Sequence, residues 1–171
     1  MIEIKFARLT EKARIPTKRD EDAGYDIYAD MRNNWRYVIE PHTTELIPTG
    51  ITSIIPRSYC FILKERGSTG TKGMAQRCGV IDSGYRGEWF VPITNTNNHS
   101  IVIYNDAHLS DYRVQNQLQD TGDLILYPAS KAICQALLIE VPQTKITEIS
   151  IEELEANESE RGNGKLGSSG K

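Results

Sequence analysis

The apolar residues of this chain recur mainly with a period of two, which limits the fold more than any other feature. Ile2, Ile4 and Phe6 alternate with charged or small residues at the start. Further runs rich in β-branched and aromatic residues, bounded by Gly, Pro, Asn and Asp, lie at 35–39, 45–51, 59–63, 89–93, 101–104, 124–127 and 133–141. Short runs with such boundaries are typical of strands. They predict an all-β sandwich or barrel rather than alternating βα units.

Helix signals are scarce. Residues 68–75 are expected to form at most a short helical turn, and residues 105–119 have only a loose helical period that starts at Asp106 as a candidate N-cap. Pro92 lies inside a strand run and predicts an edge strand or a bulge, because proline cannot donate a hydrogen bond to a ladder.

Length and charge exclude several classes of protein. The 171 residues fit one ordinary domain, and the net charge of -3 argues against a nucleic-acid partner. No apolar run approaches the roughly 20 residues that span a bilayer, and the start does not resemble a signal peptide. Cys60, Cys78 and Cys134 are widely separated, which favours reduced thiols over a zinc site. We therefore expect a cytoplasmic protein without a membrane partner.

The C-terminal segment 151–171 differs in composition from residues 1–150, which we interpret as the β domain. Residues 151–160 contain five glutamates, and residues 161–171 are rich in Gly and Ser. Such a segment cannot form a core, so a flexible end is one interpretation. The other is an arm that becomes ordered on an anion such as a triphosphate, because it offers backbone N–H groups, hydroxyls and cations.

Five segments carry the polar residues that indicate chemistry. They are Ala-Gly-Tyr-Asp at 23–26, Glu-Arg-Gly-Ser-Thr-Gly at 65–70, Gly-Val-Ile-Asp-Ser-Gly-Tyr-Arg-Gly at 79–87, Ile-Cys-Gln at 133–135 and the tail 161–171. Singly, the first four could be a turn, a loop with a surface ion pair, a hairpin and a strand with one satisfied amide. In this order, however, the segments resemble the five motifs of the homotrimeric dUTPases.

This resemblance implies a distorted jelly-roll or β-barrel subunit with little helix, in agreement with the independent strand pattern. It also implies a homotrimer that hydrolyses dUTP to dUMP and pyrophosphate with Mg²⁺, which supplies dUMP and keeps uracil out of DNA. The variant motifs are similar to those of phage-type and some bacterial members. If the chain is phage-encoded, its expected location is the host cytoplasm.

The resemblance gives the third motif the chemical step and the reading of the nucleoside. Asp82 corresponds to the carboxylate that orients and deprotonates the water for in-line attack on the α-phosphorus, and it also meets the sugar 3′-hydroxyl. Tyr85 corresponds to the ring beneath the deoxyribose, which leaves no room for a 2′-hydroxyl.

A hairpin around residues 76–81 is expected to read the uracil edge. Its backbone at Gly79, Val80 and Ile81 would admit uracil, leave no space for the methyl group of thymine and mispair with cytosine. The family usually has Asn where this chain has Gln76, so the contact of this longer amide stays open.

The first, second and fourth motifs would hold the metal and the phosphates. Asp26 corresponds to the aspartate that holds a water on the magnesium ion. Arg66 and Ser68 belong to the second motif, where Gly67 replaces the usual serine, so either Ser68 or backbone N–H groups alone would bind the phosphates. Gln135 corresponds to the glutamine of the fourth motif.

One family position cannot be transferred. The arginine that usually precedes the glutamine of the fourth motif by three residues is Ala132 here, with Lys131 adjacent.

The tail would complete the site. Arg161 corresponds to the arginine that clamps the γ-phosphate, and Ser168 and Ser169 to the pair that hydrogen-bonds it, next to Gly167. Leu166 stands where the family has an aromatic ring over the uracil. An aliphatic side chain can exclude water but cannot stack as a ring does.

Residues from about 95 to 122 look like an insert relative to a typical member. A tolerated surface excursion is one interpretation, and a docking surface for a regulatory protein partner is the other.

Two rival functions remain. A dCTP deaminase shares the fold, but Tyr85 fits the hydrolase and the run 90–95 lacks the glutamate that a deaminase would use. The second rival is a regulatory binding module on the same scaffold, against which the intact Asp82 argues.

Overall fold

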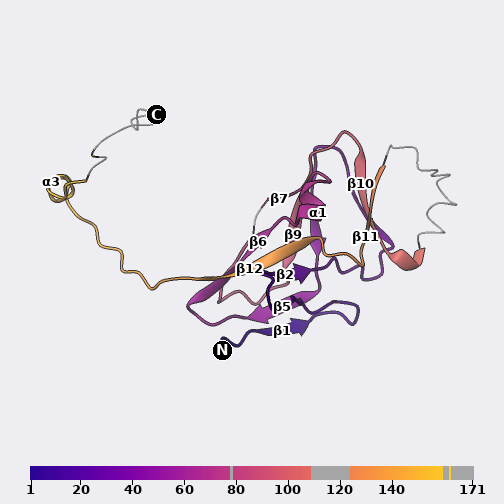
Figure 1. The fold of residues 1–171 in the computed structure, drawn as a ribbon, viewed down its shortest axis with the longest axis horizontal. Coiled ribbons are helices and arrows are strands. Elements are labelled where there is room, and N and C mark those ends of the chain that lie inside the picture. The colour runs from indigo at the N-terminus through magenta and orange to yellow at the C-terminus, as the bar shows by residue number, and fades with distance from the viewer. Residues whose placement is uncertain (78, 109–123, 160–161, 163–171) are drawn as a thin grey trace. The chain divides into compact units, whose positions relative to one another are not determined.

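The structure is a computed structural model that describes residues 1–171 except 78, 109–123, 160–161 and 163–171 (Figure 1). By its internal contacts the chain divides into two units, Met1–Val141 and Pro142–Lys171. Strands dominate the first unit and the described helices are short, so the expectation of an all-β fold with little helix is confirmed. None of the described helices is long and apolar enough to cross a membrane.

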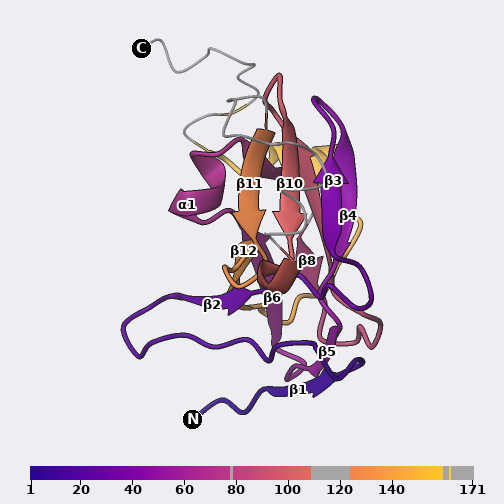
Figure 2. The same cartoon turned by 90° about the vertical axis from the view of Figure 1, so that its right-hand side faces the viewer.

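The first unit is built from small sheets. Its strands are β1 (Lys5–Arg8), β2 (Gly24–Ile27), β3 (Arg36–Ile39), β4 (Thr44–Pro48), β5 (Ile51–Ile54), β6 (Tyr59–Lys64), β7 (Met74–Gln76), β8 (Val80–Ile81), β9 (Phe90–Asn95), β10 (Ser100–Tyr104), β11 (Leu124–Pro128) and β12 (Cys134–Glu140). Among the described residues they pair in the orders β1-β5, β11-β10-β3, β2-β12-β6-β8 and β4-β9-β7. Figure 2 shows β11, β10 and β3 side by side.

The core follows from the period-two pattern. In β6, Phe61 and Leu63 are buried whereas Ile62 between them is half-buried, as expected when alternate side chains point to opposite faces. The rings of Phe61 and Trp89 lie 5.2 Å apart, and Phe6 from β1 contacts both. These aromatic contacts join the two-stranded sheet β1-β5 to the rest of the core.

Thr49 and Gly50 separate β4, which ends at Pro48, from β5. Gly50 adopts a φ of 66°, which other residues rarely accept. A Cβ at this position would also lie only 2.7 Å from the Cβ of Ala13. The bend between the two strands therefore depends on glycine.

The expectation for Pro92 was wrong, because β9 is the central strand of its sheet. The carbonyl of Pro92 accepts the N–H of Arg77 at 3.2 Å. In an antiparallel ladder the N and the C=O of a residue face the same neighbour. The missing N–H of Pro92 therefore faces residue 77, just after β7 ends, and the regular part of the ladder loses no bond.

The segment expected as an insert begins in well-ordered structure. Asn95 is the last residue of β9, is fully buried and donates through Nδ2 to the carbonyls of Ile39 (2.9 Å) and His99 (2.8 Å). β10 and β11 pair in parallel, and a parallel pair requires a long crossover connection. Of the helix expected at 105–119, the structure has a 3₁₀ turn at Asp106–His108, and residues 109–123 lie outside the described residues.

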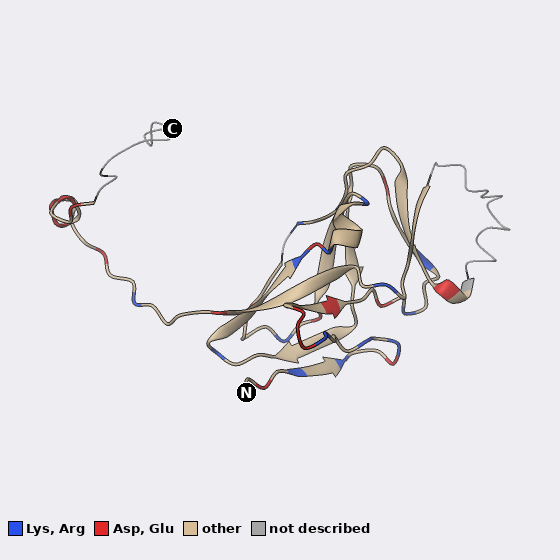
Figure 3. Cartoon of the chain, in the orientation of Figure 1, with Lys and Arg blue, Asp and Glu red and all other residues tan. Residues whose placement is uncertain are grey.

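The described residues also form two short α-helices, one in each unit. α1 (Gly67–Gly70) begins one residue before the helical turn expected at 68–75 and overlaps it at residues 68–70. In the second unit, α3 (Ile151–Glu155) begins after Ser150, whose Oγ accepts the N–H of Glu153 at 3.1 Å. The acidic residues of α3 are red in the ribbon of Figure 3. The sequence analysis missed this helix, although Ser-x-x-Glu is a recognised helix start.

Candidate active site

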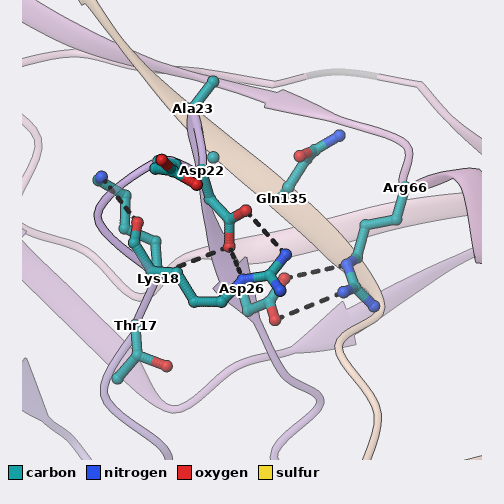
Figure 4. A pocket seen from close by; sticks show the side chains of 10 residues that line it. Thr17, Lys18, Asp22, Ala23, Asp26, Arg66 and Gln135 are labelled. Carbon is teal, nitrogen blue, oxygen red and sulfur yellow. Dashed lines mark hydrogen bonds and ion pairs between the residues drawn. The ribbon is translucent and has the colours of Figure 1, made fainter.

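Three of the expected site residues lie together although they are far apart in the sequence. Gln135 of β12 pairs directly with Asp26 of β2. Arg66 follows β6, which pairs with the other side of β12. The Nε of Arg66 lies 2.9 Å from Oδ1 of Asp26, and its Nη2 donates to Oδ2 at 3.5 Å (Figure 4). We call Asp26, Arg66 and Gln135 the Asp26 cluster.

Thr69 fixes the start of α1. Its fully buried Oγ1 accepts the N–H of Arg66 at 2.9 Å and donates to the carbonyl of Arg66 at 3.1 Å. Gly67 and Ser68 are exposed, and nothing lies within 4 Å of a Cβ added at Gly67. The backbone at Gly67 is therefore open to close approach by a ligand, while Arg66 is held from behind.

The amide of Gln135 also has a fixed orientation. Its Nε2 donates to the carbonyl of Glu65 at 2.8 Å. On the opposite side, a Cβ added at Gly24 would lie 2.6 Å from Oε1 of Gln135. Glycine at position 24 of the first motif thus leaves room for the amide of the fourth motif in its present orientation. Gln135 is thus both a strand residue with a satisfied amide and a neighbour of Asp26 in the cluster.

A cavity of about 720 Å³ adjoins the Asp26 cluster. Besides the cluster it is lined by Gly24 at the start of β2 and by the loop before this strand, namely Thr17, Lys18, Arg19, Glu21, Asp22 and Ala23. Arg19 and Asp22 form an ion pair at 2.9 Å, and the guanidinium holds the pKa of the Asp22 carboxyl below its usual value. The sequence analysis missed this loop, although a run of charges directly precedes the first motif.

Tyr127 of β11 lies beneath the second motif. The ring is 1% exposed, and its hydroxyl donates to the carbonyl of Ala132 at 2.6 Å. Burial raises the pKa of Tyr127, whereas hydrogen bonding from Ser68 and the charge of Arg66 act in the opposite direction. Ala132, at the position where the resemblance implies an arginine, is buried and carries no charge into the cavity.

The third motif forms a turn held by its own residues. The N–H of Tyr85 donates to the carbonyl of Asp82 at 3.0 Å and closes a turn over Ser83 and Gly84. The guanidinium of Arg86 donates to the carbonyls of Ser83 (2.7 Å) and Tyr85 (2.8 Å). The Tyr85 hydroxyl donates to the carbonyl of Glu88 at 2.8 Å. We call residues 79–87 the Asp82 turn, in which the side chain of Asp82 is exposed.

The expectation of a hairpin at residues 76–81 needs correction. In the described residues β7 pairs with β9, whereas β8 pairs with β6 in a different sheet. The segment from Gln76 to Val80 therefore crosses between two sheets. Gly79 lies tightly on β6, because a Cβ there would come 2.8 Å from the carbonyl of Leu63. Val80 is 60% exposed and Ile81 is buried.

The Asp26 cluster and the Asp82 turn are separate within one chain. β2 and β8 form the two edges of the sheet β2-β12-β6-β8. Three strand spacings lie between them, so Asp82 is at least roughly 14 Å from Asp26. Arg161, Leu166, Gly167, Ser168 and Ser169 lie outside the described residues. One chain thus presents two halves of the expected site at different places.

The sequence profile of the dUTPase family matches residues 10–110. The deoxyuridine 5′-triphosphate nucleotidohydrolase of Candida albicans is 31% identical over 170 residues, covering 98% of this chain and 88% of the relative. The protein of the same name from fowlpox virus is 30% identical and covers 99% of both chains. This chain belongs to the dUTPase family.

Solved structures agree with this membership at the level of the fold. The dUTPase of Staphylococcus bacteriophage 80alpha, solved with dUpNHpp, superimposes with a TM-score of 0.72 at 21% identity and covers 99% of both chains. The EIAV dUTPase gives a TM-score of 0.60 at 20% identity and covers 87% of this chain and 98% of its own. The expected jelly-roll-like fold of the dUTPase family is therefore confirmed.

Proposed function

We propose that this chain hydrolyses dUTP to dUMP and pyrophosphate, in the cytoplasm, by attack of water on the α-phosphate. The observation that carries the proposal is the Asp26 cluster, in which three motifs of the dUTPase family meet beside a polar cavity. Full-length similarity to nucleotidohydrolases of deoxyuridine 5′-triphosphate supports the choice of substrate.

The triphosphate is assigned to the Asp26 cluster. Arg66 supplies a planar guanidinium that suits phosphate oxygens, and the open backbone at Gly67 together with Ser68 supplies further donors. Gln135 adds an amide whose orientation is fixed by Glu65 and Gly24. The side chain of Thr69 holds only the backbone of Arg66. The guanidinium can therefore move from Asp26 to a phosphate without displacing α1.

Magnesium fits this donor set. No group of three or more His, Cys, Asp and Glu side chains that could hold an ion occurs among the described residues. A hard ion held mainly by phosphate oxygens and waters needs few protein ligands, and Asp26 offers one carboxylate at the cavity. When bound, the ion neutralises charge on the phosphate oxygens. Asp26 would hold it through a water.

Asp82 is proposed to orient the attacking water and accept its proton. Its carboxylate is exposed at a turn that Arg86 fixes through two backbone carbonyls, so it is accessible and held in place. A carboxylate placed within hydrogen-bonding reach of the water is suited to this role. Tyr85, whose hydroxyl is tied to Glu88, offers a fixed ring edge for excluding a 2′-hydroxyl.

The uracil is proposed to meet the backbone of Gly79, Val80 and Ile81. Val80 and Ile81 form β8, which pairs with β6 and lies at the edge of its sheet among the described residues, so the pairing fixes the backbone that would meet the base. The side chain of Gln76 lies at the start of the segment that leads to β8.

A homotrimer is proposed because one chain does not complete the site. The separation of at least roughly 14 Å between Asp26 and Asp82 is too large for both to act on one α-phosphate. In an oligomer that places the Asp82 turn of one subunit against the Asp26 cluster of another, Asp82 and Asp26 from different chains could act on one nucleotide. The tail from Arg161 to Ser169 would then close over the γ-phosphate, with Leu166 near the base and Gly167, Ser168 and Ser169 on the phosphate.

The test is one incubation with dUTP, dCTP and UTP followed by chromatography of the products. We expect dUMP and pyrophosphate from dUTP, and little turnover of UTP. Formation of dUTP from dCTP would instead identify a deaminase, and the absence of any turnover would favour a binding module. Omission of magnesium should abolish the hydrolysis.

A further inference from the structure

Hydrogen bonds of Gly79, Arg77 and Gln76 attach the segment from Gln76 to Val80 to its surroundings, in addition to the pairing of its two ends in β7 and β8. The carbonyl of Gly79 accepts the N–H of Leu63 at 2.7 Å, and the N–H of Arg77 donates to the carbonyl of Pro92 at 3.2 Å. These two contacts join backbone to backbone. The third is different, because the N–H of Gln76 donates to Oε1 of Glu65 at 2.9 Å. A side chain therefore holds the start of this segment.

Glu65 occupies the junction between the segment and the Asp26 cluster. Its carbonyl accepts Nε2 of Gln135 at 2.8 Å, while its carboxylate accepts the N–H of Gln76. Its side chain is only 33% exposed, and the ion pair with the neighbouring Lys64 is long, at 3.8 Å. The carboxylate therefore makes a shorter contact with the N–H of Gln76 than with the ammonium group of Lys64.

We propose that Glu65 is a positioning residue that sets the selectivity for the base, by fixing the backbone that reads uracil. The inference rests on the proposed function, because it takes residues 76–81 as the part that contacts the base. The physical reason is that an oxygen acceptor at this place fixes the direction of the Gln76 N–H, and a carboxylate does so somewhat more strongly than a neutral oxygen. Without it, the end of β7 at Gln76 is held from the side of β9 alone, and the backbone at Gly79, Val80 and Ile81 is positioned less firmly.

The effect should fall on the base more than on the phosphates. Arg66 is held by Thr69, and that attachment does not use the Glu65 side chain. The backbone carbonyl that holds Gln135 is present whatever side chain occupies position 65. Loss of the carboxylate therefore removes the attachment of Gln76 while the Asp26 cluster keeps its own contacts.

The experiment compares binding of dUMP and dCMP to the full-length protein by calorimetry, for wild type, Glu65→Ala, Glu65→Asp and Glu65→Gln. Glu65→Asp keeps the charge but withdraws the carboxylate by one methylene. Glu65→Gln keeps an oxygen acceptor at the same distance. Lys64→Gln is the matched control, because it removes the long ion pair and leaves the bond to Gln76 intact. Melting temperatures are measured for all variants, and Glu65→Asp serves if Glu65→Ala fails to fold.

We expect Glu65→Ala to lower the preference for dUMP over dCMP about tenfold, with Glu65→Asp between it and wild type. Glu65→Gln should restore most of the preference, and Lys64→Gln should leave it unchanged. Binding of inorganic triphosphate should change less than twofold in every variant. In wild type the amide proton shift of Gln76 should follow the titration of Glu65, and this titration should vanish in Glu65→Gln.

An unchanged preference in Glu65→Ala would overturn the proposal, as would a Glu65→Gln variant that is as unselective as Glu65→Ala. A wild-type protein that does not distinguish dUMP from dCMP would overturn it as well. The proposed function fails separately, if wild type binds dUMP selectively but releases no pyrophosphate from dUTP.

Discussion

The Asp26 cluster and the Asp82 turn are built in different ways. The cluster joins residues from β2, from the start of α1 and from β12, and its contacts span 40 positions from Asp26 to Arg66 and 70 from Glu65 to Gln135. The Asp82 turn is tied to distant residues at its ends, through the pairing of β8 with β6 and the bond from Oγ1 of Thr52 to the carbonyl of Arg86. Around Asp82 itself, its hydrogen bonds join residues one and three positions apart. The first depends on the whole sheet, whereas the second, around Asp82, depends on a few neighbouring residues.

This difference predicts how the two parts respond to mutation. A change in the Asp26 cluster should alter the position of several groups at once, because its residues hold one another. A change at Asp82 should remove one chemical group and leave the turn intact, because the described contacts of the turn use other side chains and the backbone.

Replacement of Asp82 should have the largest effect. Asp82→Asn keeps the volume and the backbone bond to Tyr85 but cannot accept the proton of the water. We expect kcat to fall on the order of 10²–10⁴-fold, with nucleotide binding nearly unchanged. Single-turnover kinetics and calorimetry measure the two quantities. Glu3→Gln, which removes a charge at the exposed N-terminus, is the control, and full turnover by a folded Asp82→Asn protein would exclude Asp82 as the base.

Deletion of Arg161–Lys171 should have the next largest effect. The proposed contacts of this tail go chiefly to the γ-phosphate, so kcat/KM for dUTP should fall on the order of 10²-fold through loss of positioning. Calorimetry should show weaker binding of an unhydrolysable dUTP analogue and little change for dUMP. A shorter deletion of Gly170–Lys171 is the control. Equal weakening of both ligands would contradict a γ-phosphate clamp.

Loosening the second motif should cost less but should act on stability and function together. Thr69→Val removes the buried hydroxyl that caps α1 and should lower the free energy of unfolding by about 1–2 kcal/mol. Because Arg66 loses the side-chain bonds from Thr69 to its backbone, KM for dUTP should also rise. Thr71→Val is the matched control, since this exposed hydroxyl bonds only to the carbonyl of Gly67 in the described contacts. Equal effects of the two variants on KM would mean that Thr69 does not hold the phosphate loop.

The smallest expected effect concerns pH. The N–H of Glu65 itself and then that of Gln76 hold the pKa of the Glu65 carboxyl below its ordinary value of 4.5. A lowered pKa in the folded state adds stability above the ordinary value, and this contribution is lost as the pH falls through the folded value. The difference in melting temperature between wild type and Glu65→Gln should therefore be largest near pH 6–7 and shrink below about pH 4.

The comparison of melting temperatures at different pH values can also contradict the ionisation of Glu65. A difference that stays constant from pH 7 to pH 3 would show that Glu65 is not ionised in its contact with Gln76. Glu3→Gln serves again as the control for loss of a carboxylate at an exposed position.

Much of the fold could be predicted from local pattern, because strand formation follows from alternation and from Gly and Pro at the boundaries. The runs at 59–63 and 101–104 correspond closely to β6 and β10. Partner choice was harder to predict. Pro92 lies in a central strand because β7 ends where the missing N–H would be needed, and the sequence around Pro92 does not contain that information. α3 could have been predicted from Ser150 and Glu153.

The site was predicted in the same uneven way. Asp26, Arg66, Gln135 and the Asp82 turn could be identified from the order of the motifs. Tyr127 and Glu65 could not, because their contacts join them to residues that are distant in the sequence: Tyr127 lies under the second motif, and Glu65 holds Gln76. A motif is a set of residues at fixed short spacings, and these two contacts join residues that lie in different motifs or outside any motif.

The sequence by itself determined the period-two strands, the turn at Asp82 and the set of polar residues that belong to the dUTPase family, since each depends on neighbours along the chain. Only the tertiary structure decided that Gln135 faces Asp26 and that β2 and β8 lie at opposite edges of one sheet. Strand order is set by the packing of whole faces against a common core, a sum over many distant contacts. That order keeps Asp82 away from Asp26 within one chain.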